Sequence, residues 1–382
     1  MQFKDIVGQQ AVKNHLLQTV KDERISHAQL FLGPEGSGAL ALAYAYAQYI
    51  CCENKQPQDS CNECSSCRKF NKLVHPDLHF SYPFFASHHE NTALTFIEDW
   101  RKAFLANPYL GLDEWRDQLN ADNKQANINI AEAHSIIKKL SLKPFESEYK
   151  ILIMWLPEYL NQQGNALLKI IEEPAQKTLF LLVAQNQEQI LNTIISRTQL
   201  VKIPKLTNQE VASYLENQNI ESAKSKQLAY LSNGNLQSAL QLSKEQDNDF
   251  HELFLQWLRA CWGNAGLTIV NYTEGELAKL GRENQKNFFK YGVSLMRECM
   301  LYISNTSSLI HLPPKDLEFI SKFSQVLNLS KAEAIAKELE KAQYHIERNA
   351  NPKILFLDVS LTLVKILKFN SFRQNADSNI LL

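Results

Sequence analysis

The feature that constrains the fold most is a short apolar run that leads into a glycine-rich turn and then into helical sequence. The run covers residues 28–32, the turn 33–38, and a helix is expected over 39–51. Two later runs, 151–154 and 179–183, are also short and apolar without alternation. Parallel strands that are covered by helices on both faces have this pattern. The sequence therefore predicts an α/β domain with a doubly wound parallel sheet.

Helical sequence follows this first domain, which we expect to cover residues 1–205. A capping-box signature at Thr207 predicts the first helix of a small helical lid domain over 206–243. An all-α C-terminal domain is expected over 249–382. Inside the first domain, the aromatic-rich segment at about 80–127 matches no motif, and we interpret it as an insertion of unknown role.

The charge balance and the apolar runs exclude several classes of protein. Lys and Arg number 40 against 41 for Asp and Glu, a net charge of -1, which argues against coating of DNA through bulk charge. No run approaches the roughly 18–20 apolar residues that span a bilayer. The N-terminus has no apolar run fit for a signal peptide. We therefore expect a soluble, cytoplasmic protein with no membrane partner.

Five of the seven cysteines lie within residues 51–67, and four of them have the spacing C-x8-C-x2-C-x2-C. These four are Cys52, Cys61, Cys64 and Cys67. A C-x2-C knuckle lets two thiolates reach one ion, and a tetrahedral structural zinc site takes four thiolates at ~2.3 Å. We expect a structural zinc module over 51–68 rather than a disulfide framework. Cys51 is an alternative first ligand, and His75 could substitute for one of the four.

The glycine-rich turn has the context of a P-loop, in which backbone N–H groups and a helix N-terminus cradle phosphates. Its glycines are Gly33, Gly36 and Gly38. In an alignment with G-x-x-x-x-G-K-[ST], Gly33 and Gly38 take the two glycine positions. Ala39 then stands in place of the lysine, and Leu40 stands in place of the hydroxyl that binds magnesium. The turn is thus predicted to be a degenerate P-loop.

The second half of such a site is also missing. After the run 151–154, where a P-loop enzyme carries acidic residues, the sequence has Trp155 and Leu156. Phosphoryl transfer depends on a positioned lysine, magnesium and water-orienting groups. We therefore predict a chain that does not hydrolyse ATP and holds no cofactor other than zinc, while weak residual nucleotide binding through backbone amides stays open.

Three further stretches fit one family. The family is the delta prime subunits of the bacterial DNA polymerase III clamp loader, within the AAA+ clamp-loader family. The sequence resembles its opening segment at residues 3–9 and its first strand and turn at residues 27–34. It also resembles the helix after the family's second strand at residues 165–174. The cysteine spacing is similar to the zinc module that these subunits share with the gamma and tau ATPase subunits. Residues 196–198, Ser-Arg-Thr, resemble the family's Ser-Arg-Cys motif, with Thr198 in place of the cysteine.

The resemblance implies a P-loop (AAA+) domain, a lid domain and a helical collar that holds an oligomer together. It implies a non-hydrolysing stator subunit that supplies Arg197 in trans, as an arginine finger, to ATP on a neighbouring gamma or tau subunit. An always-charged, planar guanidinium suits that role, although an arbitrary arginine would more often make a surface ion pair. Gln237 stands where the family's G-x-x-R-x-A-L sensor has arginine, which agrees with the loss of ATP chemistry.

The implied partners are the gamma and tau ATPase subunits, the delta subunit and, through the complex, the sliding clamp and primed DNA. Two other hypotheses stand beside this one. An active ATPase subunit of the gamma/tau type would need the side chains that Ala39, Leu40 and Trp155 replace. A stand-alone zinc-bearing DNA-binding module would bind DNA tightly without partners, with an affinity that falls steeply with salt.

Overall fold

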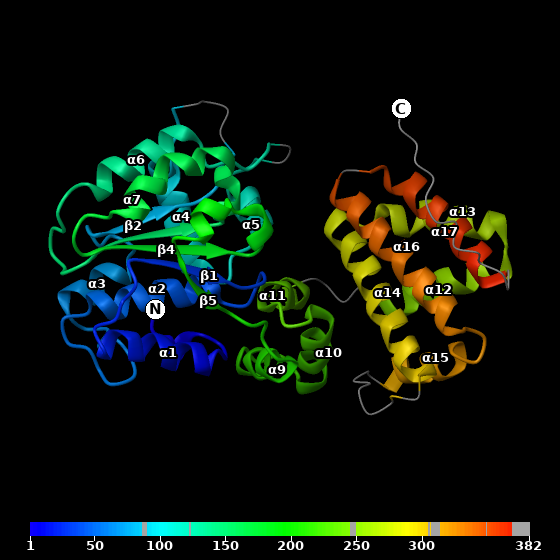
Figure 1. The fold of residues 1–382 in the computed structure, drawn as a ribbon. Helices are drawn as coiled ribbons and strands as arrows, with labels where there is room; N and C mark the ends of the chain where they lie inside the picture. The colour runs from blue at the N-terminus through cyan, green and yellow to red at the C-terminus, as the bar shows by residue number, and fades with distance from the viewer. Residues whose placement is uncertain are drawn as a thin grey trace. The chain divides into compact units, whose positions relative to one another are not determined.

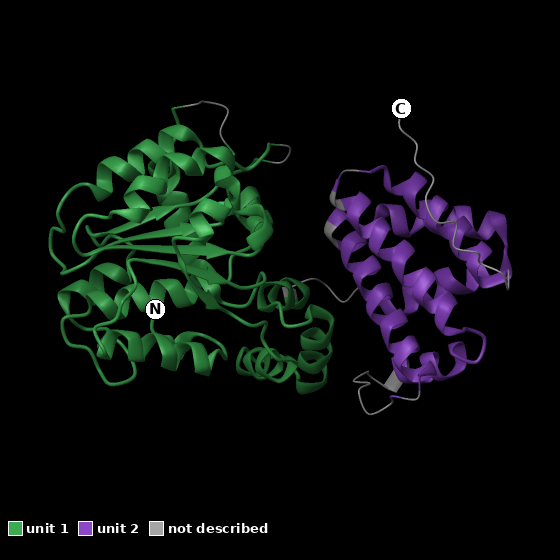
Figure 2. Cartoon of the chain, viewed as in Figure 1, with its two compact units in different colours: residues 1–244 green, residues 245–382 purple. Residues whose placement is uncertain are grey.

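The computed structural model describes residues 1–85, 90–121, 124–244, 250–304, 306, 314–348 and 350–368. The chain forms two compact units, residues 1–244 and 245–382 (Figure 2). Residues 245–249, which include the start of the expected C-terminal domain, lie outside the described residues, as do 86–89 and 122–123 of the expected insertion and the last residues, 369–382.

A five-stranded sheet forms the centre of the first unit (Figure 1). In spatial order its strands are β2 (Leu78–Ser81), β3 (Lys150–Trp155), β4 (Thr178–Ala184), β1 (Ala28–Leu32) and β5 (Gln199–Lys202). Each neighbouring pair is parallel. Every residue of β3 and β4 is buried, because helices cover both faces of the sheet. The predicted parallel α/β core is confirmed.

Two sets of helices cover the sheet. On one face, side chains from five helices share a core with Phe31, Ile153 and Leu181. These helices are α1 (Gln10–Lys21), α2 (Ala39–Cys51), α3 (Ser65–Phe70), α4 (Ile97–Ala106) and α5 (Leu112–Gln118). On the other face, a second core gathers around Leu152, Phe180 and Leu182. It includes α6 (Ile130–Leu140), the 3-10 segment η3 (Pro157–Leu167), α7 (Leu168–Glu172) and α8 (Asn192–Ile195).

The aromatic segment expected as an insertion is part of the first core. Tyr82 and Trp100 stack with ring centroids 4.1 Å apart, and Trp100 meets the Trp115 ring edge-on at 5.4 Å. The Trp115 indole N–H donates to the carbonyl of Pro83 at 2.7 Å. The expected start of the insertion at residue 80 lies inside strand β2, so the segment outside the sheet begins after Ser81.

Three helices follow the sheet within the same compact unit: α9 (Asn208–Asn217), α10 (Ser222–Ser232) and α11 (Leu236–Lys244). Thr207 Oγ1 accepts from the Glu210 N–H at 3.2 Å, and Glu210 Oε2 accepts from the Thr207 N–H at 2.8 Å. The predicted capping box is therefore present. We refer to these helices together as the α9–α11 segment.

In the second unit, every regular element among the described residues is helical. These elements are α12 (Phe250–Gly263), α13 (Gly266–Gly275), η5 (Leu277–Lys279), α14 (Arg282–Ile303), α15 (Pro314–Phe323), α16 (Leu329–Glu347) and α17 (Pro352–Lys368). Their core is aromatic: the rings of Phe289 and Phe356 stack 4.7 Å apart, and the buried Trp257 donates to Ser360 Oγ at 2.7 Å. No helix in the described part of the chain is long and apolar enough to cross a membrane.

Candidate functional site

The glycine-rich turn joins the carboxyl end of β1 to the start of α2. Gly36 and Gly38 have positive φ angles of 70° and 86°, a conformation that glycine adopts without steric cost. Gly38 is the N-cap residue of α2. The backbone of the turn thus keeps the strand–turn–helix arrangement in which P-loops bind phosphate.

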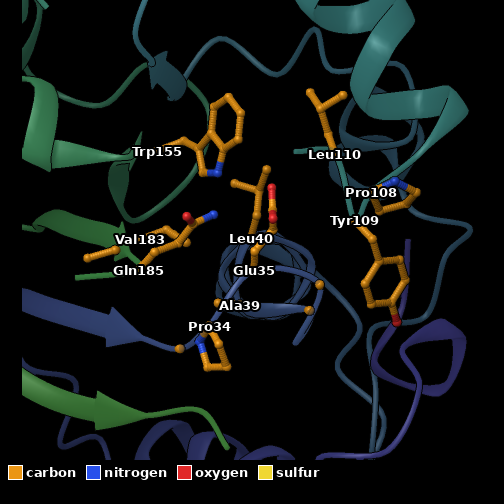
Figure 3. Close-up of a pocket in the computed structure, with 14 residues that line it drawn as sticks. Pro34, Glu35, Ala39, Leu40, Pro108, Tyr109, Leu110, Trp155, Val183 and Gln185 are labelled. Carbon is orange, nitrogen blue, oxygen red and sulfur yellow. The ribbon is translucent and has the colours of Figure 1, made fainter. Parts of the chain in front are cut away.

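Protein atoms fill the space above this turn. Leu40 lies between Trp155 on β3 and Leu110, with Glu35 beside it (Figure 3). Leu40 is 5% exposed, Trp155 3% and Leu110 7%. The cavity that remains has a volume of about 30 Å³, whereas ligand pockets have roughly 300–1,000 Å³. A nucleotide would therefore enter this space only if the side chains around it moved.

Two residues that sequence reasoning missed, Tyr109 and Leu110, line this cavity with Pro108. They come from the segment between α4 and α5, inside the expected insertion. No motif marks them, because they meet the turn only through a contact that spans about seventy residues of sequence. Gln237, in the position of the missing sensor arginine, is 5% exposed and lies beside Gly111.

Glu158, the first carboxylate after β3, is held by backbone rather than placed in this cavity. Its Oε1 accepts from the N–H groups of Gln185 at 2.6 Å and Asn186 at 2.8 Å, after the end of β4. Burial raises the pKa of Glu158, and these two N–H groups oppose that rise. Glu158 thus ties the end of β3 to the end of β4 and does not line the cavity above the turn.

A wider hollow of about 600 Å³ lies beside the turn, on the side of β5. Gly33 and Pro34 line it, together with Lys202 and residues 185–188. Residues 36–40, whose backbone would cradle phosphates, do not line it. This hollow therefore lacks the groups that make a P-loop a phosphate site.

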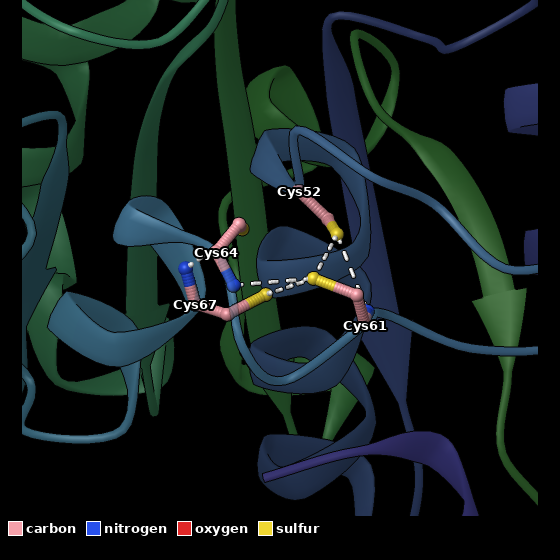
Figure 4. A group of neighbouring side chains, drawn as sticks. All are labelled: Cys52, Cys61, Cys64 and Cys67. Carbon is pink, nitrogen blue, oxygen red and sulfur yellow. Dashed lines mark hydrogen bonds between the residues drawn. The ribbon is translucent and has the colours of Figure 1, made fainter.

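The four cysteines of the predicted zinc module meet at one point (Figure 4). The Sγ atoms of Cys52, Cys61, Cys64 and Cys67 all lie within 4.8 Å of one another. The Cys52–Cys61 and Cys61–Cys67 sulfur distances are 3.5 and 3.9 Å, and four ligands at ~2.3 Å around a tetrahedral ion would be about 3.8 Å apart. The cluster could therefore hold a metal ion with little rearrangement.

Backbone N–H groups point at three of these sulfurs. The N–H of Cys61 donates to Cys52 Sγ at 3.3 Å, that of Cys64 to Cys61 Sγ at 3.3 Å, and that of Cys67 to Cys64 Sγ at 3.4 Å. Such bonds favour the thiolate form that binds metal. The arrangement fits the ligand set of a structural metal site with all four positions taken by protein.

The structure gathers Cys52, and not Cys51, into the cluster. The Cys51 sulfur lies 3.5 Å from Ser147 Oγ, and burial raises the pKa of this thiol to about 12. His75 is also outside the four, since its Nδ1 accepts from the Asp77 N–H at 3.2 Å and its ring packs on Phe70.

Arg197 lies just after α8 and is held by its neighbours. Its Nε donates to Glu172 Oε2 at 3.1 Å, and its Nη1 donates to the Thr193 carbonyl at 2.9 Å. The Arg197 side chain is 32% exposed and that of Glu172 58%. A pair this exposed contributes only about 0–1 kcal/mol of stability, so an incoming anion could replace Glu172 at little cost.

Arg197 and the glycine-rich turn lie at opposite ends of the sheet. Strands β1 and β5 are parallel, with Gln29 paired to Gln199 and Leu32 to Lys202. Arg197 precedes β5 and the turn follows β1, so the paired residues alone separate them by about 10 Å at ~3.3 Å per residue. Arg197 therefore does not act on a ligand bound at its own chain's turn.

Comparison with known proteins finds a matching family and several similar proteins for part of the chain. Residues 8–207, which are 200 of the 382 residues, match a family described as DNA polymerase III, delta subunit. Similar curated proteins include the DNA polymerase III subunits tau and delta' of Bacillus subtilis (strain 168), 27% identical over 247 residues and 25% identical over 241 residues. The subunit delta' of Yersinia pestis is 27% identical over 174 residues.

These alignments are partial on both sides. They cover 63% of this chain for each of the two Bacillus proteins and 45% for the Yersinia protein. They cover 37% of tau, 60% of the Bacillus delta' subunit and 39% of the Yersinia one. The chain thus matches less than two thirds of the length of each of these relatives.

Proposed function

Because the chain belongs to the family DNA polymerase III, delta subunit, we propose that it is a non-hydrolysing clamp-loader subunit of the delta prime type. In this role it is a stator that supplies Arg197 to ATP on a neighbouring gamma or tau subunit. Its other partners are the delta subunit and, through the complex, the sliding clamp and primed DNA. It acts in the cytoplasm, where the clamp is loaded.

The observation that carries this proposal is the contrast between the two ends of the sheet. The turn that would bind a nucleotide lacks lysine at Ala39 and is filled by Leu40 and Trp155. At the other end, the Arg197 guanidinium is partly exposed and donates to exposed Glu172, to the Thr193 carbonyl and to Ser196 Oγ. A planar, permanently charged group can stabilise the charge that spreads over a transferring phosphoryl group.

The alternative, an active subunit of the gamma/tau type, has support from sequence, since the tau subunit of Bacillus subtilis is among the relatives. The side chains at the turn favour the non-hydrolysing role. Leu40 has no hydroxyl for magnesium, and Trp155 has no carboxylate to hold it. Magnesium-dependent ATP turnover by the isolated chain would decide for the alternative.

The test of the proposed role is ATP hydrolysis by the partner ATPase subunits, reconstituted with this chain and stimulated by clamp and primed DNA. We expect Arg197→Ala to assemble normally and to lower the rate. Fingers contribute about 10³–10⁵-fold at a single site, and the total rate should fall by the share of the one site next to this chain. Arg197→Lys should restore little, because lysine lacks the planar fork.

Glu172→Gln is the matched control, since it breaks the same ion pair but leaves the guanidinium in place. It should support hydrolysis at the wild-type rate or above. Equal rates for wild type and Arg197→Ala in equally intact complexes would show that Arg197 has only a structural role.

We also propose that the metal held by the four cysteines is zinc and that it is structural. Four sulfur ligands suit zinc, and a site closed by four protein ligands has no open position for a substrate. Bound there, zinc would join the end of α2 to α3 through Cys52 and Cys67.

A further inference from the structure

We propose that the segment Pro108–Gly111 is an internal plug: it occupies the space in which a nucleotide would lie and joins the glycine-rich turn to the α9–α11 segment in its place. The inference assigns a role to part of the aromatic insertion. It rests on the proposed function only in treating the turn as a site that has lost ATP chemistry.

Tyr109 makes the central contacts of this plug. Its ring lies against the turn, because a Cβ at Gly38 would be 3.0 Å from Tyr109 Cε1. Its hydroxyl accepts from the Val7 N–H at 2.8 Å, and burial raises its pKa, so the hydroxyl stays neutral. The same side chain belongs to the apolar core of the α9–α11 segment, with Val211 and Leu236. One residue thus contacts the turn, the N-terminal segment and the α9–α11 segment.

Gly111 sits between the turn and helix α11. A Cβ at this position would lie 2.5 Å from Glu35 Oε1 on the turn and 3.1 Å from Gln237 Nε2 on α11. Glu35 Oε2 in turn accepts from Asn235 Nδ2 at 3.4 Å. The plug backbone therefore passes through a space that is closed by side chains from both sides.

Direct bonds between the turn and α11 complete the connection. The Gly36 carbonyl accepts from the Leu236 N–H at 3.2 Å. A Cβ at Gly36 would lie only 2.0 Å from Asn235 Oδ1, so the two segments approach as closely as glycine allows. A bound nucleotide comes and goes, whereas the residues that make these contacts belong to the same chain. The α9–α11 segment is therefore held against the turn without a ligand.

The experiment uses the isolated full-length chain, so that its outcome does not depend on Arg197 or on any ATPase partner. Hydrogen exchange is measured for the amides of α9–α11 and, as an internal reference, for those of α6 across the sheet. We expect Tyr109→Ala to speed exchange in α9–α11 by roughly tenfold or more while α6 changes little, because local opening becomes easier only where the plug is lost.

Two further variants make the test specific. Tyr109→Phe removes only the hydroxyl that accepts from Val7, so it should give the same pattern more weakly and remains informative if Tyr109→Ala does not fold. Phe84→Ala removes a ring that is also buried in the insertion but packs on Phe96, and it should leave exchange in α9–α11 unchanged.

Nucleotide binding gives the second readout. Titration of the wild-type chain with a fluorescent ATP analogue should show no saturable binding. Saturable binding by the wild type would overturn the plug. Equal increases in exchange for α9–α11 and α6 in both Tyr109→Ala and Tyr109→Phe would also overturn it. So would an increase in α9–α11 exchange by Phe84→Ala as large as that by Tyr109→Ala. None of these outcomes bears on whether Arg197 acts in trans.

Discussion

The cysteine cluster and the glycine-rich turn are two motifs of one domain that differ in whether the side chains of a ligand site are present. The cluster keeps all four of its ligand side chains, and its sulfurs lie at distances that suit one ion. The turn has the backbone shape of a phosphate-binding turn, with left-handed Gly36 and Gly38, but it carries Ala39 and Leu40 where a P-loop has lysine and a hydroxyl.

The difference shows that the backbone shape of a binding motif can be present without the side chains that would bind the ligand. At the turn, apolar side chains such as Leu40 and Trp155 close the space above the glycines and stabilise the core by burial. At the cluster, Cys52 and Cys67 are buried, and a buried thiolate is costly without an ion, so the proposed metal and these ligands would depend on one another.

Trp155→Asp returns an acid to the magnesium position but should destabilise the protein most. Loss of a fully buried tryptophan costs about 3–5 kcal/mol, and a carboxylate among Leu40, Leu110 and Trp100 adds a desolvation cost. Chemical denaturation measures the loss, and a titration with ATP and magnesium should show no gain of binding. A stable variant that binds nucleotide would mean that the turn is still a site.

Removal of the metal should have the next largest effect. An ion that binds the folded cluster and not the unfolded chain contributes about 4 kcal/mol at a thousand times its Kd. Thermal unfolding with and without a chelator, alongside elemental analysis, measures this. If the melting temperature is the same with the metal present and removed, the cluster does not stabilise the domain.

Gly36→Ala should cost about 2 kcal/mol, because φ is positive there and the new methyl group meets Asn235. Gly275→Ala is the matched control, since a Cβ at position 275 meets nothing within 4 Å. Denaturation midpoints of the two variants give the comparison. Equal midpoints would show that the turn is not tightly held against α11.

Substitution of Cys51 should change stability least. Comparison with substitution of Cys52 tests which of the two neighbouring cysteines is the first metal ligand. Cys51→Ala should keep full metal content and lose about 1 kcal/mol, because it removes only a buried sulfur. Cys52→Ala should lose metal. Elemental analysis of both variants checks the assignment, and the reverse pattern would make Cys51 the first ligand.

The sequence predicted the central strands but not the edges of the sheet. Strands β1, β3 and β4 lie inside the sheet, so helices bury both of their faces and their sequences are plain apolar runs. The strands that were missed, β2 and β5, are the two edges. In β5 only Val201 is buried, so the segment has no apolar run to recognise.

At the candidate site, the sequence predicted what depends on local spacing. The spacing of the cysteines predicted their cluster. The contact of Tyr109 with Gly38 depends on how the insertion folds back over the sheet, and local pattern carries no information about that. Sequence therefore showed which side chains stand at the turn but not which residues pack above it.

The parallel pairing of β1 and β5 gives the domain a polarity, with Arg197 before the start of β5 and the glycine-rich turn after the end of β1. Under the proposed function, subunits that follow one another donor end to turn end form a row with a direction. In that row, this chain would supply an arginine to one neighbour and would have no nucleotide site to receive one from the other. It would therefore stand at one end of the row.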